Sequence, residues 1–169
     1  MIVSLSYTGS MFRRPLTLIL LCVFGPSFGQ KYEGPRPPKP DAPYLLHASN
    51  LVETEAGEAK EEKRKDGMAY VIAGASSPAR TPMAEPIWLV AAEKLAVQKL
   101  QLYKLEVKGG QREVFFPQKK RKDGPRPLYL TFKQLAPGLY RLEASETLEI
   151  GEYSLTPEGA NQVFCFQVY

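Results

Sequence analysis

Four glutamates near the C-terminus are the first candidates for chemistry in this chain. They follow one another at three-residue intervals, as Glu143, Glu146, Glu149 and Glu152. Two carboxyl groups held about 5 to 9 Å apart can act as acid and base in glycoside hydrolysis. Four glutamates along a hairpin are far more often a solvated face, so we expect no enzyme here. Catalysis by this cluster is the third of three functional hypotheses.

The residues that could bind a metal or act as a nucleophile are few. The chain has one histidine, His47, and two cysteines, Cys22 and Cys165. A zinc site uses several such ligands at short spacing, and no phosphate-binding loop or hydrolase motif occurs. We therefore predict no catalytic residue, no metal site and no cofactor. Cys165 lies in an apolar run and is expected to be a buried small hydrophobe, with an intermolecular disulfide as the alternative.

A basic motif, Lys-Arg-Lys-Asp-Gly, occurs twice, at residues 63–67 and 120–124. Asp-Gly favours a turn, and the basic side chains keep a sheet edge soluble, so two solvated turns are the simpler interpretation. The alternative is that both loops meet and bind an anionic partner, such as a phosphorylated envelope polymer or lipid head groups. That patch would consist of Lys63, Arg64, Lys65, Lys120, Arg121 and Lys122.

Residues 1–29 have the layout of a signal peptide, with Met11 as the expected true start. A basic pair precedes an apolar run, a break and small residues: Arg13-Arg14, Leu16–Phe24, Gly25-Pro26 and Ser27-Phe28-Gly29. The apolar run is shorter than the roughly 20 residues that span a bilayer. We therefore expect export to the periplasm or the extracellular space, with no transmembrane segment in the mature chain.

The charge of the mature chain is nearly balanced. The whole chain has 22 basic and 18 acidic residues. The first 29 residues contain two arginines and no acid, which leaves 20 basic against 18 acidic residues, or +2. Such a balance gives no electrostatic footprint for nucleic acid, so we expect no nucleic-acid partner.

The mature chain divides into a spacer, residues 30–43, and one domain, residues 44–169. Five prolines fall within residues 35–43 and favour an extended polyproline II segment. From Tyr44 onward, short apolar runs alternate with turn residues, which is typical of a sandwich or barrel. Two glycines between Leu100–Val107 and Gln111–Phe116 predict a hairpin. We predict an all-β fold, a single antiparallel β-sandwich of about 7–9 short strands, with at most one helical turn, at Glu93–Lys99.

The pattern L-x-x-G-x-Y-x-L occurs twice, with its tyrosines at Tyr140 and Tyr153. The second copy resembles the tyrosine corner of immunoglobulin-like sandwiches. Over residues 128–169 the chain resembles uncharacterised secreted bacterial proteins with an immunoglobulin-like β-sandwich. This resemblance implies that the Tyr153 hydroxyl caps the corner and that Gln162–Tyr169 is the last strand, and it implies no activity.

Two functions remain ahead of catalysis. The first is a non-enzymatic interaction module, monomeric, whose partner is a protein or an envelope component that the sequence does not identify. The alternative is a ligand-binding module for envelope polysaccharide or lipid. A deep pocket or a group of exposed rings would favour the alternative.

Overall fold

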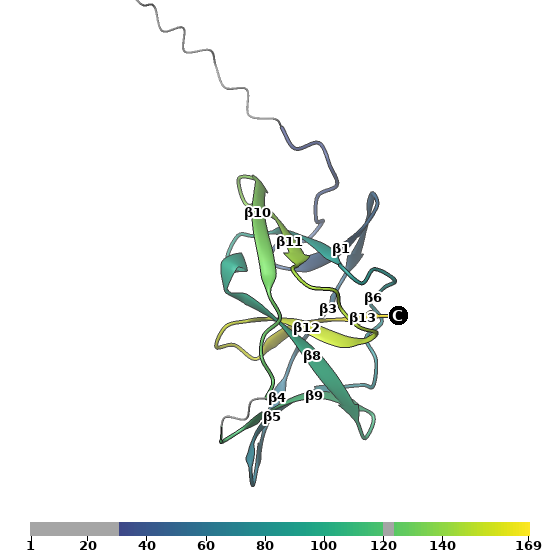
Figure 1. Cartoon of the computed structure of the whole chain (residues 1–169). Coiled ribbons are helices and arrows are strands. Elements are labelled where there is room, and N and C mark those ends of the chain that lie inside the picture. Colours follow the sequence, from purple (N-terminus) through teal and green to yellow (C-terminus); the bar gives the residue numbers. More distant parts are fainter. Residues whose placement is uncertain (1–30, 120–123) are drawn as a thin grey trace, which may run out of the picture. The chain divides into compact units, whose positions relative to one another are not determined.

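The computed structural model describes residues 31–119 and 124–169, and these residues are all-β. Thirteen strands form two sheets, and a single 3-10 turn is the only helical element among them (Figure 1). The all-β prediction is confirmed. The predicted number of strands is wrong, because short polar stretches also pair at the margins of a sheet: β3 (Glu55–Glu58), β4 (Lys60–Arg64) and β6 (Arg80–Thr81).

The first sheet has five antiparallel strands. Their spatial order is β10 (Leu130–Ala136), β11 (Leu139–Ala144), β7 (Ile87–Ala91), β1 (Pro43–His47) and β2 (Asn50–Glu53). The buried residues of β7 form its centre, since Trp88, Leu89 and Val90 are each 0% exposed.

The second sheet has eight strands. Seven follow the order β3, β13 (Gln162–Val168), β12 (Gly151–Pro157), β8 (Leu100–Lys108), β9 (Gln111–Pro117), β5 (Gly67–Ala73) and β4. The eighth, β6, pairs in parallel with β13. The other pairs are antiparallel.

The second sheet curls into a half-barrel because its two margins lie on one stretch of chain. The strand β3 pairs with β13 at one margin, and β4 pairs with β5 at the other. Ala59 alone separates β3 from β4, and its amide donates to the Asn161 carbonyl over 2.8 Å. The two margins are therefore held close together by the chain itself.

The curl produces two cores from the two faces of one sheet. In β13, Phe164 and Phe166 pack into the main core between the sheets, where Phe166 lies edge-on to Trp88 at 5.1 Å. The alternate residues Val163 and Cys165 point into the half-barrel and belong to the second core. Every residue from Val163 to Phe166 is consequently buried.

Several local predictions are confirmed. The hairpin between β8 and β9 turns through Gly109 and Gly110, whose φ angles of 57° and 77° are readily adopted only by glycine. The helical turn is the 3-10 turn Val97–Lys99, which leads into β8. No helix in the described ranges is long and apolar enough to cross a membrane.

The last residues of the proline-rich segment contact the first sheet. The Asp41 carboxylate accepts hydrogen bonds from the amides of Glu93, Lys94 and Leu95 at 2.8 to 2.9 Å. Burial acts to raise the pKa of Asp41, but these three hydrogen bonds outweigh it and hold the pKa below its ordinary value. Asp41 therefore fixes the turn that precedes the 3-10 element.

The corner hydrogen bond expected for Tyr153 is present. Its hydroxyl donates to the Glu149 carbonyl over 2.8 Å, while its ring stacks on Phe166 in the main core. Tyr140 occupies the matching place in the first repeat and makes no side-chain hydrogen bond within the described residues.

Tyr153→Phe is expected to lower the free energy of unfolding by about 1 kcal/mol, because it leaves the Glu149 carbonyl without this donor. Tyr140→Phe removes the same atom from the matching tyrosine and should change stability by less than about 0.5 kcal/mol. Urea unfolding of both variants measures the difference, and equal losses would contradict a special role for the second corner.

Candidate functional site

The inside of the half-barrel holds a pocket with a volume of about 300 Å³. It is formed by the inward-facing residues of β4, β5, β8, β9, β12 and β13, with the turn that precedes β13. The interior of the lining is mainly apolar: Ala59, Ile72, Leu105 and Val163 are buried and Val114 is partly buried. Ser154 is the one buried polar residue among the lining residues. The volume is at the lower end of the range for small-molecule sites, which are concave and mostly apolar.

Three aromatic rings form one wall of the pocket. Phe116 lies edge-on to Tyr70 and to Tyr103, with ring centroids 5.7 Å apart in both pairs. The pairing of β5 with β9 brings Tyr70 beside Val114 and Met68 beside Phe116, which places the rings on one inner surface. All three rings are partly exposed at the pocket, so they can contact a bound molecule.

Polar side chains surround the rings at the mouth. The Tyr103 hydroxyl donates to Gln101 Oε1 over 2.8 Å, and Asn161 Nδ2 donates to Glu61 Oε1 over 3.0 Å. Burial, with the nearby Glu158 carboxylate, raises the pKa of Tyr103, so this phenol stays protonated at neutral pH. The pocket thus combines an apolar interior with hydrogen-bonding groups at its rim.

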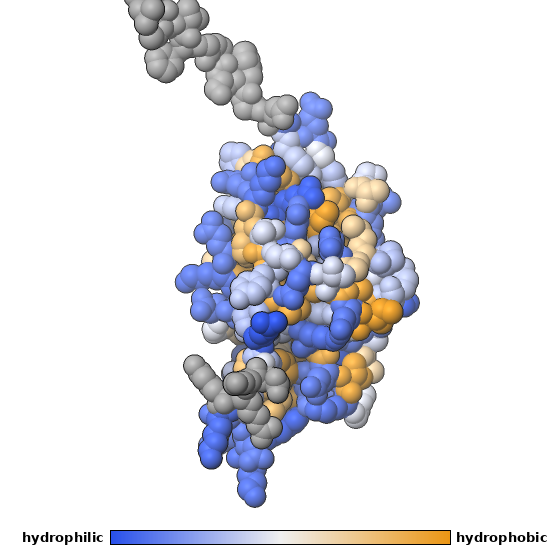
Figure 2. Space-filling view, in the orientation of Figure 1, coloured by the Kyte–Doolittle hydropathy of each residue, from blue (hydrophilic) through white to orange (hydrophobic). Residues whose placement is uncertain are grey.

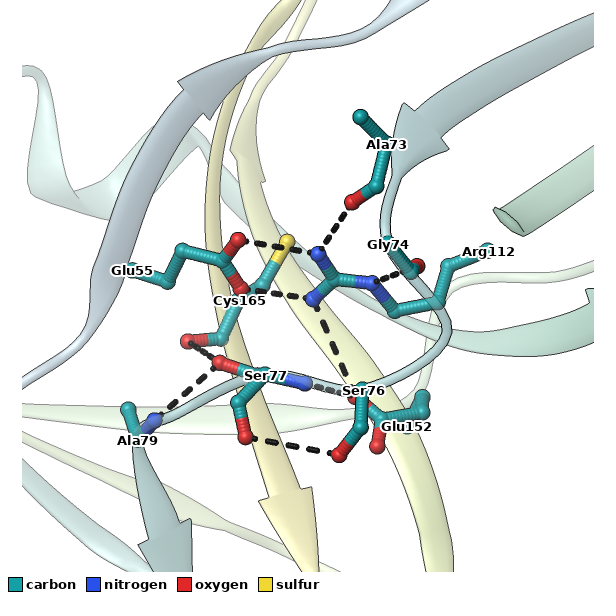
Figure 3. A network of polar contacts seen from close by, with 9 residues as sticks. All are labelled: Glu55, Ala73, Gly74, Ser76, Ser77, Ala79, Arg112, Glu152 and Cys165. Carbon is teal, nitrogen blue, oxygen red and sulfur yellow. Dashed lines mark hydrogen bonds and ion pairs between the residues drawn. The ribbon is translucent and has the colours of Figure 1, made fainter. Parts of the chain in front are cut away.

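The other end of the half-barrel is closed by Arg112, whose side chain is 0% exposed (Figure 3). Its guanidinium donates to both oxygens of Glu55 at 2.6 and 2.9 Å and to the carbonyls of Ala73 and Gly74. Glu152 Oε2 lies 3.8 Å away. Along β9, the inward residues run from Arg112 through Val114 to Phe116, so the network ends the interior opposite the pocket.

The same network holds the loop between β5 and β6. The Ser77 amide donates to Glu152 Oε2 over 3.0 Å, and its hydroxyl donates to the Cys165 carbonyl over 3.2 Å (Figure 3). Cys165 is buried, as expected from its sequence, and burial raises the pKa of its thiol to about 12. The thiol is therefore protonated at neutral pH and is a packing group.

The four glutamates do not form one group, and the prediction of a shared solvated face is wrong for Glu152. Glu152 is 3% exposed and faces the half-barrel, because Arg112 and the Ser77 amide lie there. Glu149 pairs with Lys104 at the surface over 2.5 Å. Glu143 pairs with Arg141, and Glu146 accepts from the Tyr129 amide.

No cluster in the described ranges has the three or more His, Cys, Asp or Glu side chains that would hold a metal ion. His47 is half-buried at the end of β1.

The first basic motif forms the turn between β4 and β5. Lys63 and Lys65 are exposed, while Arg64 pairs with the buried carboxylate of Glu113 over 2.6 Å and with Glu62 over 3.3 Å. The carboxylates of Glu62 and Glu113 therefore neutralise the positive charge of Arg64. A second pocket, of about 350 Å³, lies beside this pair and is lined in part by Lys108 and Glu113. These two side chains also form an ion pair with each other, over 3.4 Å.

The second basic motif begins next to the first. Gly67 pairs with Pro117, and the Gln118 amide donates to the Asp66 carbonyl over 2.8 Å. The chain therefore leaves β9 beside the β4–β5 turn. Lys120, Arg121 and Lys122 lie outside the described residues, so the predicted patch is placed only for its first half.

Neither the rings nor Glu61 were among the candidate residues. One feature of the sequence could have indicated the rings. Each ring lies two positions from an apolar residue of the same strand, as Tyr103 does from Leu105, and therefore shares a face with it. Searches against family models, curated proteins and solved structures found no match for this chain. Its function is therefore argued from the pocket.

Proposed function

We propose that this chain is a non-enzymatic binding domain that takes a small ligand into the half-barrel pocket. The observation that carries the proposal is a pocket of about 300 Å³ inside the half-barrel with three aromatic rings in one wall. The buried side chain of Arg112 lies beyond this pocket, further along the inward face of β9. Sites of this kind bind ligands through apolar contacts and a few placed polar groups. The ligand-binding hypothesis therefore comes before the interaction module.

Partner binding by strand addition has weaker support. The edge strand β10 carries an exposed Lys133, and its register with β11 shifts between Gln134 and Ala136. Both features discourage pairing with another chain. Figure 2 shows a face that is largely hydrophilic, with hydrophobic residues in small separate areas.

Of the two ligand types considered, a lipid-like amphiphile fits better than a polysaccharide. The buried lining is apolar except for Ser154, whose hydroxyl lies 3.4 Å from that of Thr156. It therefore offers few partners for the several hydroxyls of a sugar, and an unpartnered buried hydroxyl is unfavourable. An apolar group can occupy this interior while the polar end of the ligand stays at the rim.

The finer fold assignment and the location belong to the same proposal. The tyrosine corner at Tyr153 supports an immunoglobulin-like sandwich, one sheet of which curls. The signal-peptide layout of residues 1–29, which lie outside the described residues, supports export to the periplasm or beyond.

The neutral probe N-phenyl-1-naphthylamine tests the proposal, because its fluorescence rises in an apolar site. Saturable binding is expected, and Phe116→Ala should weaken it about tenfold by removing one wall. Phe115→Ala is the matched control, since Phe115 lies on the opposite face of β9, and it should change the Kd less than about twofold. Equal effects of the two variants, or no saturable binding, would contradict the proposal.

A further inference from the structure

We propose that the pocket selects an organic cation, an amine or ammonium group carried on a compact apolar body, over an anion of the same size. The inference rests on the binding function proposed above and names the ligand class. It follows from the charges and the aromatic rings of the lining.

The charge of the lining has one sign. Glu61 is its only charged side chain, and no lysine, arginine or histidine lines the pocket. Only Oε1 of Glu61 has a hydrogen-bond partner, Asn161, and Glu61 makes no ion pair within residues 31–119 and 124–169. A carboxylate at the rim thus remains available to a cationic ligand, and it repels an anionic one.

A second carboxylate, that of Glu158, adds negative charge near the pocket. The Glu158 amide donates to the Lys99 carbonyl, which holds this residue beside the start of β8. Its carboxylate is close enough to Tyr103 to contribute, after burial, to the raised pKa of that phenol. The Glu158 carboxylate therefore adds negative charge near the wall that carries Tyr103.

The rings act in the same direction. The face of an aromatic ring carries partial negative charge and attracts an ammonium group within about 6 Å of its centre. Phe116 stands at 86° to Tyr70 and at 82° to Tyr103. Because the rings are almost perpendicular, their faces point in more than one direction, and a cation can lie over a face in several orientations.

The positive side chain that follows Glu61 on the same face of β4 lies outside the pocket. Lys63 follows Glu61 by two residues on β4, opposite Met68, and therefore shares its face of the sheet. It is exposed and is not part of the lining. Exposed charges are weakened by water and salt, with a screening length of about 8 Å at physiological ionic strength. Lys63 therefore offsets Glu61 only in part.

Three probes with the same naphthalene body test the selectivity on the full chain: 1-naphthylmethylammonium, 1-naphthylmethanol and 1-naphthoate. Isothermal titration calorimetry gives their Kd values. We expect the ammonium to bind about tenfold more tightly than the carboxylate, with the alcohol between them.

Two variants test whether the carboxylate of Glu61 at the rim is a source of this selectivity. Glu61→Gln should reduce the ratio of the two Kd values to about threefold, the part that the rings retain. Glu62→Gln makes the same charge change on the outer face of the same strand and should leave the ratio unchanged.

The outcomes separate the two proposals. Equal Kd values for all three probes, or tightest binding of 1-naphthoate, would overturn the cation selectivity while the binding function stands. A ratio that falls equally in both variants would also overturn it, because the rim carboxylate would not be its source. If neither these probes nor N-phenyl-1-naphthylamine binds, the binding function fails as well.

Discussion

Arg112→Ala is expected to lower the free energy of unfolding by about 3 to 5 kcal/mol, the usual cost of breaking a buried ion pair from one side. The guanidinium is 0% exposed and donates to Glu55 and to two backbone carbonyls. Its removal leaves Glu152, which is 3% exposed, without a counter-charge. Urea unfolding measures the loss, and a variant as stable as the parent would contradict this account.

A charge-neutral replacement separates the loss of the network from the loss of the side chain. Arg112→Met combined with Glu55→Gln and Glu152→Gln removes the positive charge together with both negative ones. Buried ion pairs replaced in this way often lose little stability. The triple variant should therefore be more stable than Arg112→Ala, and a further decrease would show that backbone contacts to Ala73 and Gly74 dominate.

The same network makes stability depend on pH. Hydrogen bonds from Arg112 outweigh partial burial and hold the pKa of Glu55 below its ordinary 4.5. A carboxyl with a lowered pKa contributes its full stabilisation above the ordinary value, and that contribution is lost as the pH falls through the lowered one. The triple variant should therefore lose less stability than the parent between pH 5 and pH 3.

Strands with a strong local pattern were predictable from the sequence. The strands β8, β9 and β13 begin and end within a residue of the predicted ranges, because apolar runs and glycine turns act locally. For β3 and β4, the run of charged side chains over Glu53–Lys65 favours a solvated hairpin or an exposed edge, and both strands are edge strands. Their partners were not predictable, since charged side chains carry no pattern that selects one. Their backbones pair because β13 and β5 present open margins to them.

The curl was not predictable, because it makes both faces of one sheet apolar. Phe164 and Cys165 are equally buried, although they belong to different cores. A sequence pattern with two apolar faces does not say which face closes upon itself. The pocket forms because the sheet curls, so the sequence did not predict the pocket either.

The closed end of the half-barrel shows what a polar residue in an apolar strand can signal. Arg112 stands two positions before Val114 in the inward series of β9. A charge at such a position requires partners, and those partners come from strands far away in the chain. The position was therefore visible in the sequence, while Glu55 and Glu152 as its partners were not.

Gly67→Ala is expected to lower the free energy of unfolding by about 1 to 3 kcal/mol, the range for overpacking a buried site. A Cβ at Gly67 would collide with the Phe116 carbonyl and lie 2.8 Å from Phe115 Cζ and 2.9 Å from Pro117 Cα. Two of these atoms belong to the backbone of the neighbouring strand, which must then move. The φ angle of Gly67 is not positive. Glycine is therefore needed at this position because there is no room for a Cβ, and not because of the backbone conformation.

Gly57→Ala is the matched control, because Gly57 is a glycine in another strand of the curled sheet, β3. A Cβ there would meet only Val163 Cγ2, at an ordinary 3.8 Å. Its effect on urea unfolding should be within about 0.5 kcal/mol in either direction.

The Gly67 variant also tests whether the sheet and the pocket are mechanically linked. Any shift that relieves the collision displaces the Phe116 backbone, and the ring that walls the pocket moves with it. Gly67→Ala, studied under conditions where it is folded, should therefore bind N-phenyl-1-naphthylamine more weakly than Gly57→Ala. Unchanged binding in a destabilised Gly67 variant would show that β9 accommodates the methyl group without moving Phe116.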